Sequence, residues 1–341
     1  MKFNIVVGNP PYQANVSTSK DNDSLGKQLF PAFTEMVYSA SSQYCSLITP
    51  SRWFTGDAQD KSFLKLRSFL KEKNNIVKMF IYPSTDEVFS GVIIKGGVNH
   101  FLVDKKANSV VEFHTIKKGI DSTEKRNLFE EGFDIVFRSS MDSIIIRKVV
   151  NNSSETLSSI TTGRNAFGII GKPESLKKQT TAKKSDDDSI TVHCKNGEKR
   201  YIAKSKVPKG VEIMEHYKVF ISKSAGDPDT DTKVIGVPFF GDKDCVCTDT
   251  FFPIGCFDTK EEAENLCKYL KTVFVRYLIN VLKSSQNVTQ IVYRFVPMQD
   301  FSNSSDIEWT KSIADIDVQL FKKYNLENEK DYIMSNIKPM E

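Results

Sequence analysis

A stretch near the start of the chain has the residue types needed to hold a planar amino group. Gly8-Asn9-Pro10-Pro11-Tyr12 follows a short apolar run, Phe3 to Val7, and leads into polar residues. This order predicts a buried strand ending in a loop at the carboxyl edge of a sheet, where open α/β sheets bind ligands. Two prolines fix the backbone, so the Asn9 side chain and nearby carbonyls point in set directions, and Tyr12 can stack on the same ring.

The loop resembles the catalytic motif of amino-directed methyltransferases that use S-adenosylmethionine. The flanking sequence resembles the adenine-specific (N6) DNA methyltransferases of type II, IIG-like restriction-modification systems, from their catalytic motif through the target-recognition domain. Four further stretches carry the resemblance: Thr49 to Phe54, Val88 to Val98, Cys247 to Gly255 and Tyr293 to Phe301. Together these stretches span nearly the whole chain.

The resemblance implies a role for each residue of the loop. The exocyclic nitrogen of adenine is a poor nucleophile because its lone pair is delocalised into the ring. Asn9 Oδ1 and the carbonyl of Pro10, in the loop made rigid by Pro11, would accept its two protons and turn the lone pair toward the methyl group. Transfer would be direct, with no covalent enzyme intermediate. Tyr12 would stack on the flipped adenine. From its position just before the Gly96-Gly97 hairpin, Phe89 is expected to form the second wall, the alternative being that Phe89 is a core aromatic of the sheet.

The sequence departs from the family at its front. The family carries a Gly-containing cofactor loop upstream of the catalytic loop, and only eight residues precede Asn9. Neither Gly96-Gly97 nor Gly168 to Gly171 has the strand-to-helix setting of such a loop, so the cofactor-binding residues are unknown. We therefore expect the carboxyl-terminal portion of an enzyme, either an excised piece or one part of a split gene.

A first strand without its neighbour would be an exposed edge. We expect it to be covered by a second copy of the chain or by a separate amino-terminal methyltransferase or nuclease polypeptide. We also expect the chain alone to bind S-adenosylmethionine weakly or not at all.

The predicted fold class is α/β, with a partial Rossmann-like methyltransferase sheet followed by a mixed α+β target-recognition domain. Residues 1–120 form the second half of the catalytic domain, 121–157 connect, 158–305 form the DNA target-recognition domain, and 306–341 form carboxyl-terminal helices. Predicted strands are 3–7, 45–49, 76–82, 217–222 and 234–239, with a hairpin of 92–95 and 98–103 around Gly96-Gly97. Predicted helices are 25–41, 60–73, 142–150, 259–282, 312–324 and 327–337.

Two further expectations concern particular segments. The helix at 25–41 should bury Leu29, Phe33, Met36 and Val37 on one face. The polar stretch 172–200 should be a mobile surface excursion.

Positive charge is unevenly placed along the chain. The whole sequence has a formal net charge of +4, whereas the segment from Arg164 to Lys209 contains 12 Lys and Arg against 5 Asp and Glu, a net of +7. A local concentration of basic side chains suits phosphate contacts, although a charge run is more often a solvated face. The expected partner is double-stranded DNA, and the candidate contacts are Arg52, Lys95, Arg164, Lys183, Lys184 and Lys204. Arg52 could equally form a surface ion pair.

The cysteines and the lengths of the apolar runs indicate where in the cell the protein is expected. Six cysteines with no secretory signal indicate reduced thiols, and their spacing matches no paired metal motif, so no metal is expected. No run approaches the ~20 apolar residues that cross a membrane. We therefore predict a soluble, cytoplasmic protein with no membrane partner.

The leading function is site-specific transfer of a methyl group from S-adenosylmethionine to a flipped adenine in DNA, by the complete enzyme. One alternative is a non-catalytic DNA-specificity module. The other is a protein or RNA amino-methyltransferase, which would normally have little sequence after the loop, whereas more than 300 residues follow it here. The recognition sequence and the presence of a nuclease stay open.

Overall fold

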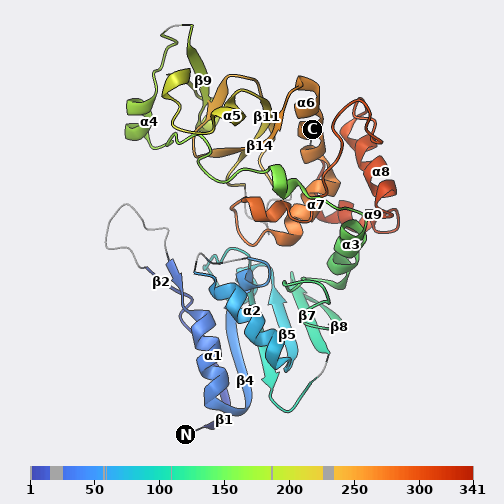
Figure 1. Ribbon diagram of the computed structural model, residues 1–341. Helices are drawn as coiled ribbons and strands as arrows, with labels where there is room; N and C mark the ends of the chain where they lie inside the picture. Colours follow the sequence, from blue (N-terminus) through green and yellow to red (C-terminus); the bar gives the residue numbers. More distant parts are fainter. Residues whose placement is uncertain are drawn as a thin grey trace. The chain divides into compact units, whose positions relative to one another are not determined.

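The structure is a computed structural model that describes residues 2–15, 26–56, 58, 60–108, 110–185, 187–225 and 234–340. Two units build the chain (Figure 1): the first extends to Ile144 and the second begins at Ile145. The methyltransferase resemblance predicted a sheet in the first unit, and this sheet positions the Asn9–Tyr12 loop.

A six-stranded mixed sheet forms the first unit, which confirms the predicted α/β class. Its order is β1-β4-β6-β5-β7-β8, with β1 parallel to β4, β5 parallel to β7, and the other pairs antiparallel. The strands are β1 (Phe3–Gly8), β4 (Ser41–Pro50), β5 (Ile76–Tyr82), β6 (Val98–Asp104), β7 (Val111–Lys117) and β8 (Ile120–Arg126). In this topology the carboxyl ends of β1, β4 and β5 meet the start of β6 at one edge, since Val98 pairs with both Pro50 and Tyr82.

The predicted hairpin around Gly96-Gly97 is wrong. Residues 92–95 are not a strand, and β6 instead pairs with β4 on one side and β5 on the other. The glycines do have the expected positive φ, 85° and 74°. A Cβ at Gly97 would lie 2.3 Å from the Tyr82 carbonyl oxygen, so the turn needs glycine in order to bring the chain close to the end of β5.

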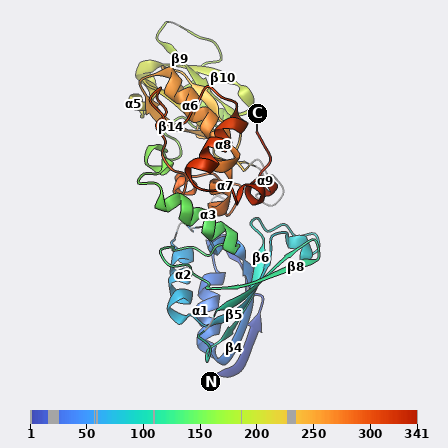
Figure 2. The ribbon, with the colours of Figure 1, turned by 90° about the vertical axis from the view of Figure 1, so that its right-hand side faces the viewer.

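Two helices, α1 (Phe30–Ala40) and α2 (Ser62–Lys73), lie on the same face of the sheet (Figure 2). The α2 helix buries Phe63, Leu66 and Leu70. They join the core that the sheet residues Leu47, Met79, Phe101 and Phe113 form.

The prediction for the first helix needs two corrections. Residues 26–28 form a short strand, β3 (Gly26–Gln28), which pairs with β2 (Gln13–Asn15). The face that α1 buries carries Phe30, Pro31 and Thr34, while Met36 is 55% exposed. The helix begins only at Phe30, with Pro31 in its first turn, and docking against the sheet rather than the apolar stripe sets its rotation.

The second unit contains two small sheets and a group of helices. The sheets have the orders β10-β9-β13 and β12-β11-β14. The strands are β9 (Ser189–His193), β10 (Lys199–Ala203), β11 (Tyr217–Ser222), β12 (Phe239–Gly241), β13 (Cys245–Cys247) and β14 (Phe251–Phe257). The helices, including α3 that leads in from the first unit, are α3 (Ser140–Asn151), α4 (Pro173–Gln179), α5 (Val211–Met214), α6 (Lys260–Lys271), α7 (Val273–Leu282), α8 (Ile313–Lys323) and α9 (Lys330–Asn336). This composition fits the predicted mixed α+β class.

Three predictions for the second unit are corrected. The polar stretch 172–200 contains α4, β9 and the start of β10, so it is not an excursion without regular structure. The strand predicted at 234–239 begins only at Phe239. The long helix at 259–282 breaks at Thr272, whose φ of −60° and ψ of 150° are not helical and whose side chain accepts a hydrogen bond from the Val275 N–H.

One local signal in the second unit acts as predicted. The Ser312 side chain caps α8 by accepting a hydrogen bond from the Asp315 N–H at 3.2 Å. None of the helices in the described ranges has both the length and the apolar character that a bilayer span requires.

Candidate functional site

The predicted loop lies directly after β1, at the edge where β4 and β5 also end. Pro10 is buried, whereas Asn9 and Pro11 are exposed. The Tyr12 carbonyl accepts a hydrogen bond from the Leu29 N–H at 3.0 Å, which ties the loop to the start of α1. No hydrogen bond within the described part of the chain uses the Asn9 side chain, so its amide oxygen is free to accept one from a ligand.

A cleft of about 420 Å³ opens beside this loop. Its lining residues are Asn9, Pro10, Pro11, Tyr12, Phe89, Val92 and Ile94. The structure therefore brings Phe89, 80 residues from Asn9 in the sequence, to the same cavity as the predicted catalytic loop. The stacking role of Phe89 stays a prediction, but its place beside the loop is the one that role requires.

The short helical turn Thr85–Glu87 holds the second wall of the cleft. Thr85 is buried, its carbonyl accepts from the Phe89 N–H at 2.7 Å, and its hydroxyl accepts from the Ile94 N–H at 3.2 Å. Thr85 therefore holds the loop at two points, Phe89 and Ile94, which both line the cleft. The sequence prediction missed Val92 and Ile94 as lining residues because it assigned them to a strand. The signal available was the glycine at each side, Gly91 and Gly96-Gly97, which separates this apolar run from the sheet.

Burial keeps the phenol of Tyr12 protonated. The ring packs against the core, and its hydroxyl is buried without a hydrogen-bond partner among the residues described. Burial raises the pKa of Tyr12 above its ordinary value, so the phenol is neutral at physiological pH. Tyr12 is therefore suited to stacking and not to accepting a proton.

Arg52 lies at the same edge, in the helical turn Ser51–Trp53 that follows β4. The Ser51 N–H donates to the Gly97 carbonyl at 3.0 Å, which joins this turn to the start of β6. Burial lowers the pKa of the Arg52 guanidinium, which nevertheless keeps its charge at neutral pH. The surface ion pair considered for Arg52 is not present in the described ranges.

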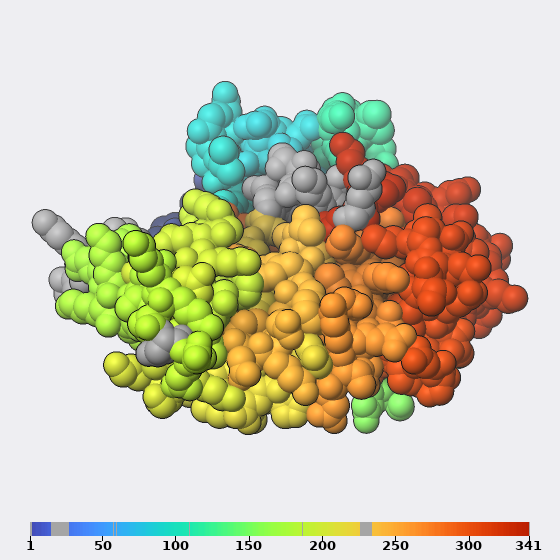
Figure 3. Space-filling view, turned by 90° about the horizontal axis from the view of Figure 1, so that it is seen from above, coloured from blue at the N-terminus to red at the C-terminus, as the bar shows by residue number. Residues whose placement is uncertain are grey.

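The predicted DNA-contacting residues of the second unit differ in their surroundings. Arg164, Lys183 and Lys184 are exposed. Lys204 instead forms ion pairs with Glu215 at 3.2 Å and Asp244 at 2.8 Å. Figure 3 shows the light green part of this unit, which contains α4, at the opposite end from the red carboxyl-terminal helices. Lys95, in the first unit, is also exposed.

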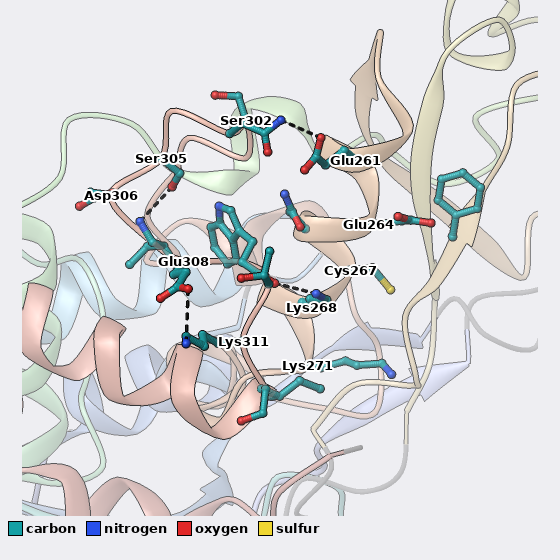
Figure 4. A pocket seen from close by; sticks show the side chains of 18 residues that line it. Glu261, Glu264, Cys267, Lys268, Lys271, Ser302, Ser305, Asp306, Glu308 and Lys311 are labelled. Carbon is teal, nitrogen blue, oxygen red and sulfur yellow. Dashed lines mark hydrogen bonds and ion pairs between the residues drawn. The ribbon is translucent and has the colours of Figure 1, made fainter.

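A roomier cavity of about 750 Å³ lies in the second unit, between α6 and residues 302–313 (Figure 4). Acids and lysines both line it, and each has a polar partner among the described residues, in part outside the cavity. The Lys268 ammonium donates to the Trp309 carbonyl at 2.6 Å, and Lys311 lies 3.4 Å from Glu308. Mixed charge whose groups are already paired does not suit the phosphate backbone of DNA, so this cavity is not the predicted site.

The described residues do not form a cradle for S-adenosylmethionine. The glycines at 96 and 97 serve the close approach to Tyr82, as shown above. Gly168 lies beside Pro208 in the second unit, where a Cβ would be 2.8 Å from the proline ring. Among the residues described, no group of three or more His, Cys, Asp or Glu side chains is placed to hold a metal ion.

Comparison with known proteins finds a family match over the segment that contains the loop. Residues 1–89 match the Eco57I restriction-modification methylase family. The match covers β1, the Asn9–Tyr12 loop, α1, β4, α2 and β5, and it ends at Phe89. It confirms the family resemblance inferred from the sequence.

Two relatives extend the comparison beyond the family match. An uncharacterized adenine-specific methylase of Mycoplasma pneumoniae is 29% identical over 177 residues, covering 49% of this chain and 41% of that protein. The type IIL restriction-modification enzyme MmeI, solved in complex with DNA, superposes with a TM-score of 0.54 at 10% identity, over 97% of this chain and 56% of MmeI. At that identity the likeness shows the fold. The chain spans about half the length of the relatives it matches.

Proposed function

We propose that this chain holds the acceptor base and recognises DNA in an adenine-N6 methyltransferase of a restriction-modification system. The cleft beside β1 carries this proposal, because it joins the Asn9–Tyr12 loop to Phe89. The family match and the adenine-specific relative support it. S-adenosylmethionine is the methyl donor of the complete enzyme in this proposal.

The groups in the cleft suit an extruded adenine. Asn9 Oδ1 and the Pro10 carbonyl oxygen each accept a hydrogen bond from one N–H of the exocyclic amine, which turns the nitrogen lone pair away from the ring. Tyr12 and Phe89 stack on the two faces of the base, and stacking of this kind contributes ~1–3 kcal/mol per base. That contribution offsets the few kcal/mol that flipping costs. No strong base is needed, in agreement with the neutral phenol of Tyr12.

Replacement of Asn9 in the complete enzyme tests the proposal. We expect Asn9→Ala to lower kcat on the order of 10²–10³-fold, because it removes an acceptor that acts in the transition state, and to leave DNA affinity nearly unchanged. Asn4→Ala is the matched control, since Asn4 lies on β1, the strand that leads into the loop, is exposed like Asn9, and its side chain accepts a hydrogen bond only from Ser42 among the described residues. Methyl incorporation into duplex DNA and fluorescence anisotropy give the two readouts.

The result of that experiment separates the three candidate functions. Near-normal turnover in Asn9→Ala would remove Asn9 from the mechanism. Specific DNA binding by an enzyme that never transfers a methyl group would favour the DNA-specificity module. Transfer to a protein or RNA, with none to DNA, would favour the remaining alternative.

The second unit supplies DNA contacts in this proposal. We expect binding to weaken steeply with salt, since each phosphate contact contributes a slope of about −0.9 to log K against log salt. The double variant Lys183→Glu and Lys184→Glu should reduce that slope by about 1–2. Lys204→Glu is the comparison, because Glu215 and Asp244 already neutralise Lys204. Binding that is insensitive to salt, or an equal loss in both variants, would contradict this assignment.

A companion polypeptide or a second copy of the chain completes the site in this proposal. The reason is β1, which among the described strands pairs with β4 alone and exposes Phe3 at 56%, Ile5 at 62% and Val7 at 71%. Apolar side chains along an edge strand favour association with another chain. We expect calorimetry to find weak or no binding of S-adenosylmethionine by the chain alone, and sizing to find a dimer or a complex. Micromolar binding by a monomer would contradict this part of the proposal.

A further inference from the structure

A short apolar run stands at the mouth of the cleft, outside the core. Val92 is 48% exposed and Ile93 is 79% exposed, and Ile94 is half-buried. Val92 and Ile94 line the cleft, so Ile93 lies between two lining residues along the chain. A single exposed isoleucine is ordinary. Three β-branched side chains in sequence at the opening of a cleft are a more specific feature.

The backbone under this run is held in place. The Ile94 N–H donates to the Thr85 hydroxyl, and the Gly97 N–H donates to the Ile94 carbonyl at 3.1 Å. The Val92 N–H donates to the Phe89 carbonyl at 3.5 Å, which links the tip to the wall of the cleft. A β-branched side chain on such a backbone has few rotamers. Ile93 is therefore a stiff apolar projection.

We propose that Ile93 acts as a wedge that enters the duplex and fills the gap left when the target adenine turns into the cleft. The inference rests on the proposed function. If Asn9 and Phe89 hold the extruded base, the duplex must lie across the mouth of the same cleft, and Ile93 is exposed between two residues that line it. Apolar side chains that insert between base steps stabilise unstacked DNA in other proteins. Ile93 is thus a positioning residue that favours the flipped state without contacting the reacting atoms.

The active enzyme that contains this chain provides the test. We expect Ile93→Ala to lower kcat/KM by about tenfold or more on a fully paired site, because three buried carbons of the wedge are lost. It should also weaken the fluorescence of 2-aminopurine placed at the target position. On a duplex whose target adenine faces an abasic site, the loss should shrink to about twofold, since that base is already unpaired.

Two further variants make the experiment specific. Ile120→Ala is the matched control, because Ile120 is 69% exposed and lies on β8, at the far edge of the sheet from β1. It should behave like the wild type on both substrates. Ile93→Leu should restore most of the activity and fluorescence, since it keeps an apolar side chain of the same volume.

Three outcomes would overturn the wedge. An unchanged 2-aminopurine signal and kcat/KM in Ile93→Ala would show that Ile93 does not assist flipping. Equal losses of kcat/KM in Ile93→Ala on the paired and abasic substrates would show that Ile93 has a structural or chemical role instead. Loss of association with a companion polypeptide, with flipping intact, would make it an interface residue. A wild-type enzyme that methylates no adenine would overturn the proposed function itself, and the wedge with it.

Discussion

The two faces of the six-stranded sheet differ sharply although the same strands build both. On the face that α1 and α2 cover, Met79, Phe101 and Phe113 are at most 1% exposed. On the other face, Ile5 and Val7 are more than half exposed. Side chains alternate along a strand, so every strand contributes to both faces. The comparison shows that the described chain covers one face of its own sheet and leaves the other to solvent or to a partner.

The contacts made by the side chains of the uncovered face differ between its two edges. Phe80 stacks between His100 and His114, with ring centroids 4.4 and 4.3 Å away. His114 then hydrogen bonds to Asp121 at 2.8 Å and to Glu112 at 2.9 Å. The half near β8 therefore satisfies its polar and aromatic groups internally. On this face, the half near β1 presents the exposed aliphatic side chains of Ile5 and Val7, and we place the companion there.

The largest effect that tests this comparison is on stability. Phe101→Ala should lower the free energy of unfolding of the first unit by about 3–5 kcal/mol, because it opens a cavity under the helices. Phe80→Ala removes the same side chain from the other face and should cost about 1 kcal/mol, the scale of an aromatic pair. Urea denaturation of both variants measures the difference. Equal losses would mean that the second face is packed as well as the first.

A charge on the bare half of the face should have a smaller effect on stability and a visible effect on association. Val7→Lys should change the free energy of unfolding by less than about 0.5 kcal/mol, since Val7 is 71% exposed. It should also reduce self-association or binding of the companion, measured by analytical ultracentrifugation. Val6→Lys is the contrasting variant, because Val6 packs against the core. A large loss of stability in Val7→Lys would show that Val7 is covered within the chain.

The smallest effect concerns the protonation of the histidines. Burial alone would lower the pKa of His114, but the hydrogen bonds and charges of Asp121 and Glu112 outweigh it and raise the pKa above 6.5. Burial, with the charge of His114, lowers the pKa of His100 below 6.5. NMR titration should resolve His114 above and His100 below that value. Asp121→Asn should lower the pKa of His114. An unchanged pKa would show that the hydrogen bond to Asp121 does not cause the shift.

The two shifts act on stability with opposite sign. The contribution of His114 is fully present below pH 6.5 and is lost as the pH rises through its raised, folded-state pKa. For His100 the unfolded state binds the proton more readily, so stability rises with pH between its lowered pKa and 6.5. We therefore expect the free energy of unfolding of the first unit to fall as the pH rises just above 6.5. The fall should be smaller in Asp121→Asn.

Local signals in the sequence determined the position of the candidate site and much of the secondary structure. An apolar strand followed by Asn9-Pro10-Pro11-Tyr12 placed the loop at a sheet edge, and the Ser312 cap marked the start of α8. These features depend on neighbouring residues, so the sequence alone carries them. The position of Phe89 before Gly96-Gly97 predicted it as a second wall, and Phe89 lines the cleft although the hairpin itself is absent. The domain boundaries and the roles of the site residues stay predictions.

Tertiary structure decided the features that depend on residues far apart in the chain. The insertion of β6 between β4 and β5, the buried face of α1 and the ion pairs of Lys204 all follow from such contacts. The break at Thr272 is similar, since Asp317 accepts hydrogen bonds from the Val273 and Phe274 N–H groups and so stabilises the start of a new helix. The apolar periodicity continues across this break, so the sequence pattern predicted a single helix over residues 259–282. The local Thr272 cap and the Asp317 carboxylate, which packing of α8 brings to this point, together satisfy the first N–H groups of the second helix.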